Sequence, residues 1–170
     1  AASDVYKRQQ KDYEVAIETA LGGSIQNIVT DNEQTAKRMI GFLKKNRFGR
    51  ATFLPLSNIS GRGGLNQRDV LSEPGVVGTA NTLVNADKEY SELVMYLLGR
   101  VLVVDNIDHA IAIGKKYRHS LRMVTIEGES LSPGGSMTGG AFKNNSNLLG
   151  RRREIEELER SVGILRKELE

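Results

Sequence analysis

The sequence predicts a mixed α/β (α+β) protein in which two related lobes precede a C-terminal coiled-coil helix. Two observations carry this prediction. The order helix, strand, helix, strand occurs twice along the chain, and the last twenty residues place apolar residues at heptad spacing. No apolar run approaches the roughly 18 to 20 residues that a transmembrane helix needs, so we expect no membrane partner.

The first lobe begins with a helix over Asp12–Leu21, where apolar residues recur at helical spacing and Gly22 supplies the stop. A strand is predicted over Ile25–Val29. Thr30 and Glu33 then form a capping-box pattern for a second helix. The segment "ATFLPL" reads as the closing strand, and the inner face of the second helix is expected to comprise Ala36, Met39, Ile40 and Leu43.

The second lobe repeats this order. Lys88–Leu98 reads as a helix, "RVLVVD" as a buried strand, Asn106–Tyr117 as a helix and "LRMVTI" as a strand. The strand-to-helix corners "VTDNEQTA" and "VVDNIDHA" share Val, Asp, Asn and Ala at matching positions. Helix capping alone also favours Asp-Asn at such a corner. We interpret the match as two related units that face one another.

A long loop separates the two lobes. The stretch "SNISGRGGLNQRDVLSEPGVVGTAN" is rich in Gly, Ser and Asn and contains one short element near Val76 and Val77. Two interpretations stay open at this point, a flexible linker and a binding loop.

The two ends of the chain differ from its middle. Residues 1–12 show no clear period and resemble a linker or a non-native segment, and the chain starts without Met, so we expect it to be part of a longer protein. At the other end, residues 147–170 are expected to start a coiled-coil helix, with the apolar residues spaced alternately three and four apart. The expected seam is Ile155, Leu158, Val162, Leu165 and Leu169.

Composition excludes several kinds of site. The chain has no cysteine and two histidines, which rules out disulfides and cysteine-based zinc sites and favours a reducing cytoplasm. His109 and His119 come with no distinctive catalytic partner, and Asp105 and Asp108 read as helix-cap residues more readily than as metal ligands. We therefore expect no catalytic residue, metal or cofactor in this chain.

The glycine-rich stretch "SLSPGGSMTGGAF" raises a specific question. Gly134 and Gly139 have the outer spacing of a phosphate-binding P-loop, but Gly140 and Ala141 stand where Lys and Ser/Thr are required. The Gly-x-Gly-x-x-Gly dinucleotide pattern is also absent. The remaining explanation is steric, because glycine allows positive φ and close backbone approach. Pairing with a strand of another subunit and a tight hairpin within one domain both fit.

The segments "YEVAIETALGGSIQNIVTDNEQTAKRMIGFLKKNRFGRATFLPL", "PGVVGTANTLV", "LLGRVLVVDNIDHAIAIGKK", "VTIEGESLSPGGSMTGGAF" and "LLGRRREIEELE" together resemble the hinge domain of bacterial SMC (structural maintenance of chromosomes) proteins. The resemblance implies a two-lobed hinge over residues 13–146, with lobes at about 13–60 and 75–146. Family hinges begin with a Gly-rich strand segment, which residues 1–12 do not show, so one lobe is expected to lack a strand.

The resemblance also implies a function. Such hinges form homodimers through strand edges, so the expected interface residues are Gly134, Gly135, Ser136, Thr138, Gly139 and Gly140. Basic residues near the coiled-coil junction imply auxiliary DNA binding by Lys143, Arg151, Arg152 and Arg153. The longer parent is expected to be a nucleoid-associated cytoplasmic ATPase with ATP and Mg²⁺ in distant head domains, which bind a kleisin-type subunit.

Two competing functions remain open from the residues. One is a non-specific DNA-binding module whose basic surface is the main function, with Lys44, Lys45 and Arg47 as further candidates in the basic run from Lys37 to Arg50. That run also fits a solvated helix face. The other is a small nucleotide-binding domain, which the failed motif tests disfavour.

Overall fold

The computed structural model describes residues 6–9, 11–61, 63–141 and 148–169. The chain divides into two units, residues 1–139 and 140–170, which are described separately. No helix in the described residues is both long enough and apolar enough to cross a bilayer. The mixed α/β class predicted from the sequence is confirmed.

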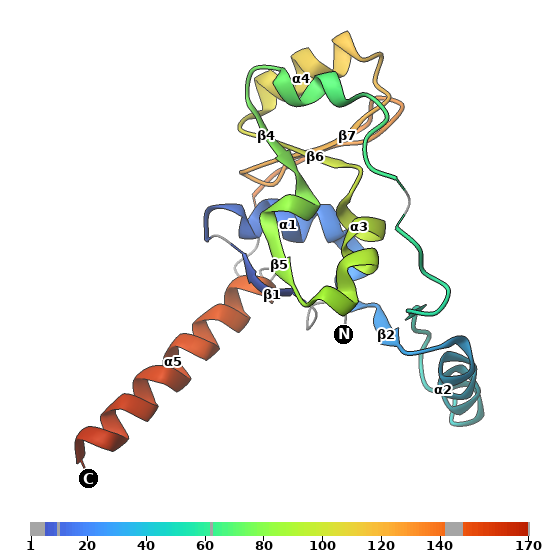
Figure 1. Cartoon of the computed structure of the whole chain (residues 1–170), viewed down its shortest axis with the longest axis vertical. Coiled ribbons are helices and arrows are strands. Elements are labelled where there is room, and N and C mark those ends of the chain that lie inside the picture. The colour runs from blue at the N-terminus through green and yellow to red at the C-terminus, as the bar shows by residue number, and fades with distance from the viewer. Residues whose placement is uncertain (1–5, 10, 62, 142–147, 170) are drawn as a thin grey trace. The chain divides into compact units, whose positions relative to one another are not determined.

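A five-stranded sheet forms the centre of the first unit (Figure 1). Its strands lie in the order β4 (Val76–Thr79), β6 (Val101–Val104), β7 (Arg122–Thr125), β8 (Ser130–Leu131) and β9 (Met137–Thr138). β6 and β7 are parallel and the other neighbours are antiparallel. All four residues of β6 are buried, as expected for a central strand covered on both faces.

Helices cover both faces of this sheet. α4 (Ile107–Lys116) packs on one face, and α1 (Glu14–Leu21) and α3 (Ser91–Leu98) lie on the other side (Figure 1). Arg122 ties β7 to α1 because its Nη2 donates to the carbonyl oxygen of Ala20 at 2.8 Å. The core under α4 is made of Val70, Leu102, Val104, Ala110, Ile113, Leu121, Met123 and Leu131.

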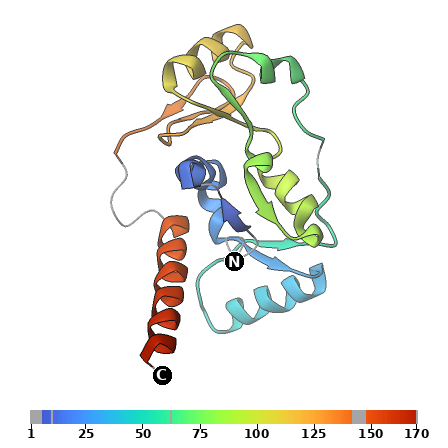
Figure 2. The same cartoon turned by 60° about the vertical axis from the view of Figure 1, so that its left-hand side comes forward.

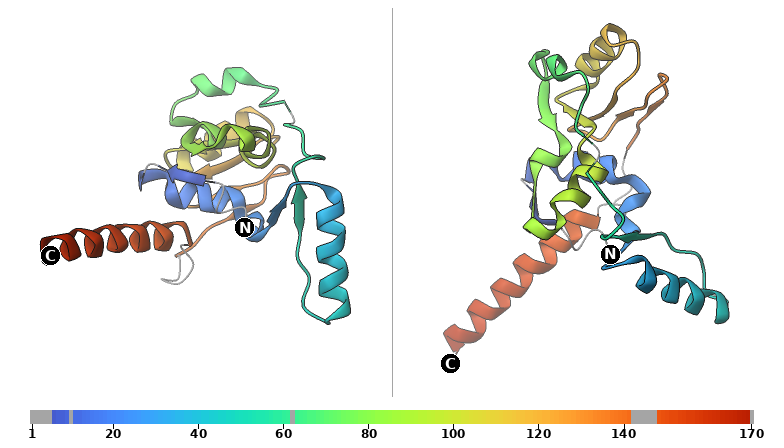
Figure 3. Two further views of the ribbon diagram at one scale, coloured as in Figure 1. Left: turned by 60° about the horizontal axis from the view of Figure 1, so that its bottom comes forward. Right: turned by 45° about the vertical axis from the view of Figure 1, so that its right-hand side comes forward.

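A second, smaller sheet belongs to the same unit. β2 (Ile28–Thr30) and β3 (Phe53–Pro55) pair in parallel, and α2 (Glu33–Lys45) connects them. Figures 2 and 3 show α2 beside these two strands, away from the five-stranded sheet. This β2-α2-β3 element and the β6-α4-β7 element are the strand-helix-strand parts of the two related helix-strand-helix-strand units that the sequence predicts, and α1 and α3 are their first helices.

Shorter elements complete the first unit. β1 (Tyr6–Gln9) and β5 (Val84–Ala86) form an antiparallel pair. Five 3₁₀ helices join the main elements in the part of this unit that the structure describes, namely η2 (Lys11–Tyr13), η3 (Gly22–Gln26), η4 (Arg68–Ser72), η5 (Ala80–Leu83) and η6 (Lys88–Tyr90). In the second unit, residues 140–141 and 148–169 are described, and α5 (Leu148–Leu169), the red helix of Figure 3, is the regular element among them.

The first lobe differs from the sequence prediction at its first strand and its helix cap. The strand was predicted from Ile25, but a 3₁₀ turn occupies Gly22–Gln26 and the strand starts at Ile28. Asn32, not Thr30, caps α2, and its Oδ1 accepts from the amide of Thr35 at 2.9 Å. Thr30 is the last residue of β2, and its hydroxyl donates to the carbonyl oxygen of Asn32 at 3.1 Å.

The N-terminal segment contains a short strand that its sequence does not signal. Tyr6–Gln9 pair with β5, so among the described residues this strand adds nothing to the two-stranded β2-β3 sheet. Backbone hydrogen bonds need no particular side chains, so an extended segment can pair with an open strand edge without a recognisable sequence signature.

The long loop is partly ordered by packing. The short element predicted near Val76 is β4, and Val70 in η4 is fully buried under α4. The hydroxyl of Tyr117 lies 3.1 Å from Glu73 Oε1 and 3.2 Å from Asp69 Oδ2, which ties this part of the loop to the end of α4. Around these contacts the loop is a packed part of the fold and not a flexible linker.

Candidate functional site

The glycine-rich stretch forms a hairpin at one edge of the five-stranded sheet. β8 pairs with β9 so that Ser130 lies opposite Thr138 and Leu131 opposite Met137. The loop between them closes where the amide of Ser132 donates to the carbonyl oxygen of Ser136 at 2.9 Å. The intramolecular hairpin is therefore present.

β9 is the last strand of the sheet, and within the described residues no strand pairs with its other side. Bonded and non-bonded pairs alternate along an antiparallel ladder. Because Ser132 and Ser136 are a bonded pair, the next bonded pair is Ser130 with Thr138. The amide and carbonyl of Met137 therefore point away from β8, toward the open edge. Met137 and Thr138 are both exposed, so this edge is accessible within the unit.

The four glycines serve different structural purposes. Gly134 and Gly135 lie in the hairpin loop with φ of 94° and 99°, a region that disfavours other residues. Gly140 has φ of 134° and a Cβ built there would meet open space. Gly139 has no such φ, but its Cβ would lie 3.1 Å from Glu129 Cγ. A side chain at Gly139 would therefore crowd the side chain of Glu129, which precedes β8.

Glu129 holds its position through Thr125, a fully buried residue at the end of β7. Thr125 Oγ1 donates to the Glu129 carboxylate, and the amide of Glu129 donates back to the same hydroxyl oxygen at 3.1 Å. The backbone amide of Thr125 also donates to the Glu129 carbonyl at 2.9 Å. These bonds fix the Glu129 side chain that a Cβ at Gly139 would meet.

The hairpin loop is anchored to the end of α4 by a residue that the sequence analysis set aside. The amide of Gly134 donates to the carbonyl oxygen of His119 at 2.8 Å. Arg118 and His119 both have positive φ, 56° and 52°, which turns the chain so that this carbonyl faces the loop. No sequence signal pointed to this role, because neither residue is a glycine and the contact uses only backbone atoms.

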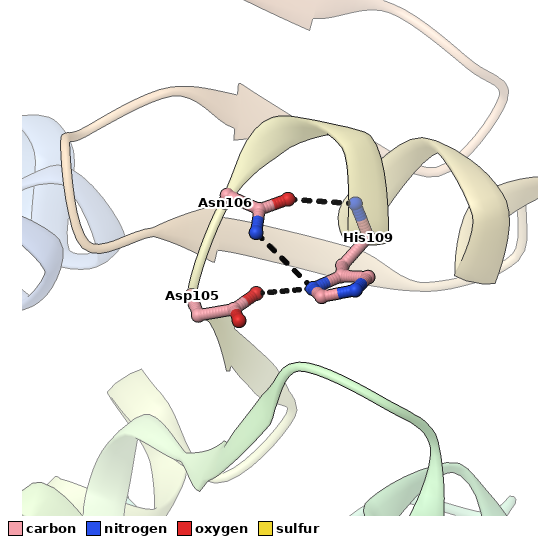
Figure 4. Close-up of polar contacts among 3 residues, drawn as sticks. All are labelled: Asp105, Asn106 and His109. Atoms are coloured by element: carbon pink, nitrogen blue, oxygen red, sulfur yellow. Dashed lines mark hydrogen bonds and ion pairs between the residues drawn. The ribbon is translucent and has the colours of Figure 1, made fainter.

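His109 lies at the start of α4, and its polar contacts in Figure 4 are with Asp105 and Asn106 in the preceding corner. Its Nδ1 is 2.7 Å from Asp105 Oδ1, and Asn106 Oδ1 accepts from the His109 amide at 2.9 Å. Asn106 is therefore the cap, and Asp105 orients the imidazole. In the described parts of the chain no three His, Cys, Asp or Glu residues cluster as metal ligands would.

Two ionisable side chains in the loop contact of Tyr117 have shifted pKa values. Burial, with the hydrogen bond to Glu73 next in size, raises the pKa of Tyr117 to about 12. The hydrogen bond from Lys116 lowers the pKa of Glu73, although partial burial opposes the shift. Both shifts favour the protonation states that keep the loop attached to α4 near neutral pH.

The basic candidates lie in the second unit. Arg151 and Arg152 are exposed on α5, while Arg153 is partly buried. Arg152 Nε is 3.4 Å from Glu156 Oε1, and Arg153 Nη1 is 3.1 Å from Glu157 Oε1. Lys143 lies outside the described residues. An approaching phosphate would therefore compete with glutamates one helical turn away.

The predicted seam occupies one stripe of α5. Ile155, Leu158, Val162 and Leu165 are each about half exposed or more, and Leu169 is 87% exposed near the helix end. All five lie within the single continuous helix, as a coiled-coil helix requires.

Comparisons with known proteins agree on one family. The profile described as "SMC proteins Flexible Hinge Domain" matches residues 3–114. The chain is 44% identical to the chromosome partition protein Smc of Bacillus subtilis over 180 residues, which cover 99% of this chain and 15% of that protein. It is also 44% identical to the Smc protein of Clostridium kluyveri, over 87% of this chain and 13% of that protein. The chain thus spans only a small part of these relatives.

Solved structures show the same similarity. An asymmetric dimer of the Geobacillus stearothermophilus SMC hinge domain matches with a TM-score of 0.85 and 40% identity, over 98% of this chain and 67% of that one. The Pyrococcus furiosus Smc hinge domain with an extended coiled coil matches with a TM-score of 0.69 and 31% identity, over 98% and 58% of the two chains.

Proposed function

The chain belongs to the SMC hinge family, and from this premise we propose that it is a homodimerisation hinge joining two coiled-coil arms. The observation that carries the proposal is the open edge of β9, which presents the backbone of Met137 between two glycine pairs. Bare backbone edges pair with strands of other chains when side chains do not obstruct them. The similar hinge from Geobacillus stearothermophilus is described as a dimer, which supports self-association.

Met137 offers a direct test of edge pairing. Met137→Pro removes an amide that points to the open edge and leaves the Ser130–Thr138 bonds to β8 in place. Met137→Ala is the matched control, because it shortens the same side chain and keeps the amide. We expect light scattering to show at least tenfold weaker dimerisation for the proline variant, and a much smaller change for the alanine variant.

Two outcomes contradict edge pairing through β9. The first is equal dimerisation by the two variants, which would place the interface elsewhere. The second is a strict monomer at tens of micromolar before any substitution. Circular dichroism and thermal unfolding of both variants separate these outcomes from loss of the fold.

We also propose that the hinge binds DNA as an auxiliary function. The alternative is a non-specific DNA-binding module whose basic surface is its main function. The candidates are Lys143, Arg151, Arg152 and Arg153, near the start of α5. Reversing these charges to Glu should lower affinity and reduce the dependence of log affinity on log salt by about 1 for each phosphate that is no longer bound. Unchanged binding would direct the search to Lys44, Lys45 and Arg47.

What we propose for the longer parent protein rests on its family alone. We propose that it is a nucleoid-associated cytoplasmic ATPase for chromosome condensation and segregation, with ATP, Mg²⁺ and a kleisin-type subunit at distant heads. The hinge itself is proposed to have no catalytic role. Calorimetry with ATP and this chain should show no binding, and saturable binding would revive the nucleotide-binding alternative.

A further inference from the structure

A cavity with two arginines in its wall lies at the end of the five-stranded sheet where the parallel strands β6 and β7 begin. Its volume is about 350 Å³. Arg100 comes directly before β6, and Arg122 is the first residue of β7. The other lining residues come from the long loop, the turn before β7 and the β8–β9 hairpin, and they are Leu65, Asn66, Gln67, Ser120, Leu121 and Pro133. The proposed hinge function uses none of these residues.

The wall of this cavity carries positive charge without a matching negative charge. Among the described residues that line it, two are arginines and none is Asp or Glu. Neither Arg100 nor Arg122 forms an ion pair with any residue that the structure describes. Two like charges beside one small cavity repel one another, and a bound anion offsets that repulsion. The cavity therefore favours an anionic ligand.

Backbone contacts hold both guanidinium groups and leave part of each one available. Arg100 Nε donates to the carbonyl oxygen of Gly63 at 3.0 Å, which leaves Nη1 and Nη2 for another acceptor. Arg122 Nη2 donates to the carbonyl oxygen of Ala20 at 2.8 Å, which leaves Nε and Nη1. Because these bonds already restrict the two side chains, binding an anion costs less side-chain entropy than it would at free surface arginines.

The neutral side chains of the wall add further hydrogen-bond donors. Gln67 Oε1 lies 3.5 Å from Ser120 Oγ, so its amide nitrogen is left for a ligand. Asn66, the preceding residue, is exposed and supplies a second side-chain amide. A phosphate monoester offers three acceptor oxygens and a charge of about −1.5 to −2 at neutral pH. This number of acceptors and this charge match two arginines and two amides better than a single carboxylate does.

The remaining wall restricts the rest of the ligand. Leu65, Leu121 and Pro133 supply apolar surface that can cover a small apolar body. The volume is at the small end of the range for ligand sites, so a compact molecule fits better than a nucleoside triphosphate. A nucleic-acid strand carries one charge per phosphate, which would leave one of the two arginines without a counter-charge. We propose that this cavity binds a small phosphate monoester with an apolar body.

Phenyl phosphate is a suitable probe, because it joins a phosphate monoester to an apolar ring. Calorimetry on the whole chain should show saturable binding to one site per chain. Phenol keeps the ring without the charge, and inorganic phosphate keeps the charge without the ring. Each of these two controls should bind about tenfold or more weakly than phenyl phosphate. In nuclear magnetic resonance spectra, the largest shifts should occur at the backbone amides of Asn66, Gln67, Leu121 and Arg122.

Three variants locate the bound phosphate. Asn66→Asp keeps the shape of the side chain but replaces an amide donor with a carboxylate that repels the anion, so binding should weaken about tenfold or more. Arg100→Gln removes one cation and should have a similar effect. Arg68→Gln is the matched control, because it removes the same charge one residue beyond the lining segment, and it should change binding about twofold or less. All three positions are exposed, so the fold should survive, and circular dichroism verifies this.

Four results would overturn the proposal. One is the absence of saturable binding at millimolar phenyl phosphate. Equal losses in Arg68→Gln and Arg100→Gln would mean a general attraction of anions to basic side chains. Unchanged binding in Asn66→Asp would place the anion outside this cavity. Displacement of phenyl phosphate by a single-stranded oligonucleotide at a lower concentration of phosphate groups would identify nucleic acid as the better occupant. The cavity uses no residue of β9 and no candidate DNA-binding residue, so this proposal and the hinge proposal can fail separately.

Discussion

The β2-α2-β3 and β6-α4-β7 elements start from the same local structure and reach different degrees of burial. Asn32 and Asn106 both have φ of −148°, with ψ of 171° and 167°. In each, the side-chain oxygen accepts from the amide three residues later at 2.9 Å. The helices, however, meet different surroundings. The corner sequence therefore determines the geometry at the start of each helix. The strands that lie beside the helix determine how much of its apolar face is buried.

Corresponding helix positions show the effect. Aligning the two caps places Ala36 at the position of Ala110, and Met39 at that of Ile113. Both alanines are buried, but Ile113 is 3% exposed and Met39 is 38% exposed. α4 packs on a five-stranded sheet, whereas α2 covers only two strands. A two-stranded sheet is too narrow to cover the whole apolar face of a helix.

Of the two corresponding residues Ile113 and Met39, truncation of the buried one, Ile113, should have the largest effect on stability. Ile113→Ala should lower the free energy of unfolding by about 2 to 5 kcal/mol, because it removes a buried side chain and leaves a cavity. Met39→Ala should cost about 1 kcal/mol or less, as exposed positions do. Urea unfolding measures both. Similar losses would mean that α2 is as well covered as α4 in solution.

Removing the two caps should produce an intermediate and nearly equal effect. Asn32→Ala and Asn106→Ala should each cost about 1 kcal/mol, because each leaves a helix amide without its acceptor. Hydrogen exchange of amides in the first turn of α2 and α4 reports each loss locally. Asn→Asp at each position is the control, since it keeps the acceptor oxygen. If removal of the cap lowered stability in only one element, the two corners would not be equivalent.

The smallest effects concern the loop contact that only the β6-α4-β7 element has. The pKa of Glu73 is lowered in the fold, so its contribution to stability is present above the ordinary value of 4.5 and is lost as pH falls through the folded value. The pKa of Tyr117 is raised from 10.0 to about 12, so its contribution is full below pH 10 and is lost as pH rises toward 12.

Variants assign these two pH effects. The difference in unfolding free energy between the unchanged chain and Glu73→Gln should shrink in the acid range, and the difference from Tyr117→Phe should shrink in the alkaline range. Lys88→Met, at a lysine outside this contact, is the control for a general change in charge. pH-independent differences would show that the loop contact does not depend on either ionisation.

The sequence predictions were more accurate for the second lobe than for the first. The elements of the second lobe were predicted closely, because "RVLVVD" is a continuous apolar run and the helix after it has a clear cap and inner face. In the first lobe, the inner face of α2 was only partly right. Ala36 is buried and Leu43 is half-buried, but Met39 and Ile40 are exposed. Periodicity indicates which side of a helix is apolar, not how much of it the neighbours cover.

The sequence indicated where the candidate site lies, but not which contacts hold it in place. The stretch from Ser130 to Gly140 was recognised as special because paired glycines are rare outside tight or crowded backbone. The support that Glu129 and His119 give was missed, since it depends on contacts between segments and on backbone atoms. The dimer and DNA roles of the named residues stay predictions.

By itself, the sequence determined the mixed α/β class, the repeated helix-strand-helix-strand order and the heptad stripe of α5, and it marked the glycine pairs as a site of unusual backbone. These properties depend on local spacing and on the conformations open to single residues. Only the tertiary structure decided that β9 is the last strand of the sheet in the described residues, that a side chain at Gly139 would crowd Glu129, and that much of the apolar face of α2 is exposed. The order of strands in a sheet and the burial of side chains depend on contacts between segments that are far apart in the sequence. A local sequence pattern does not specify those contacts.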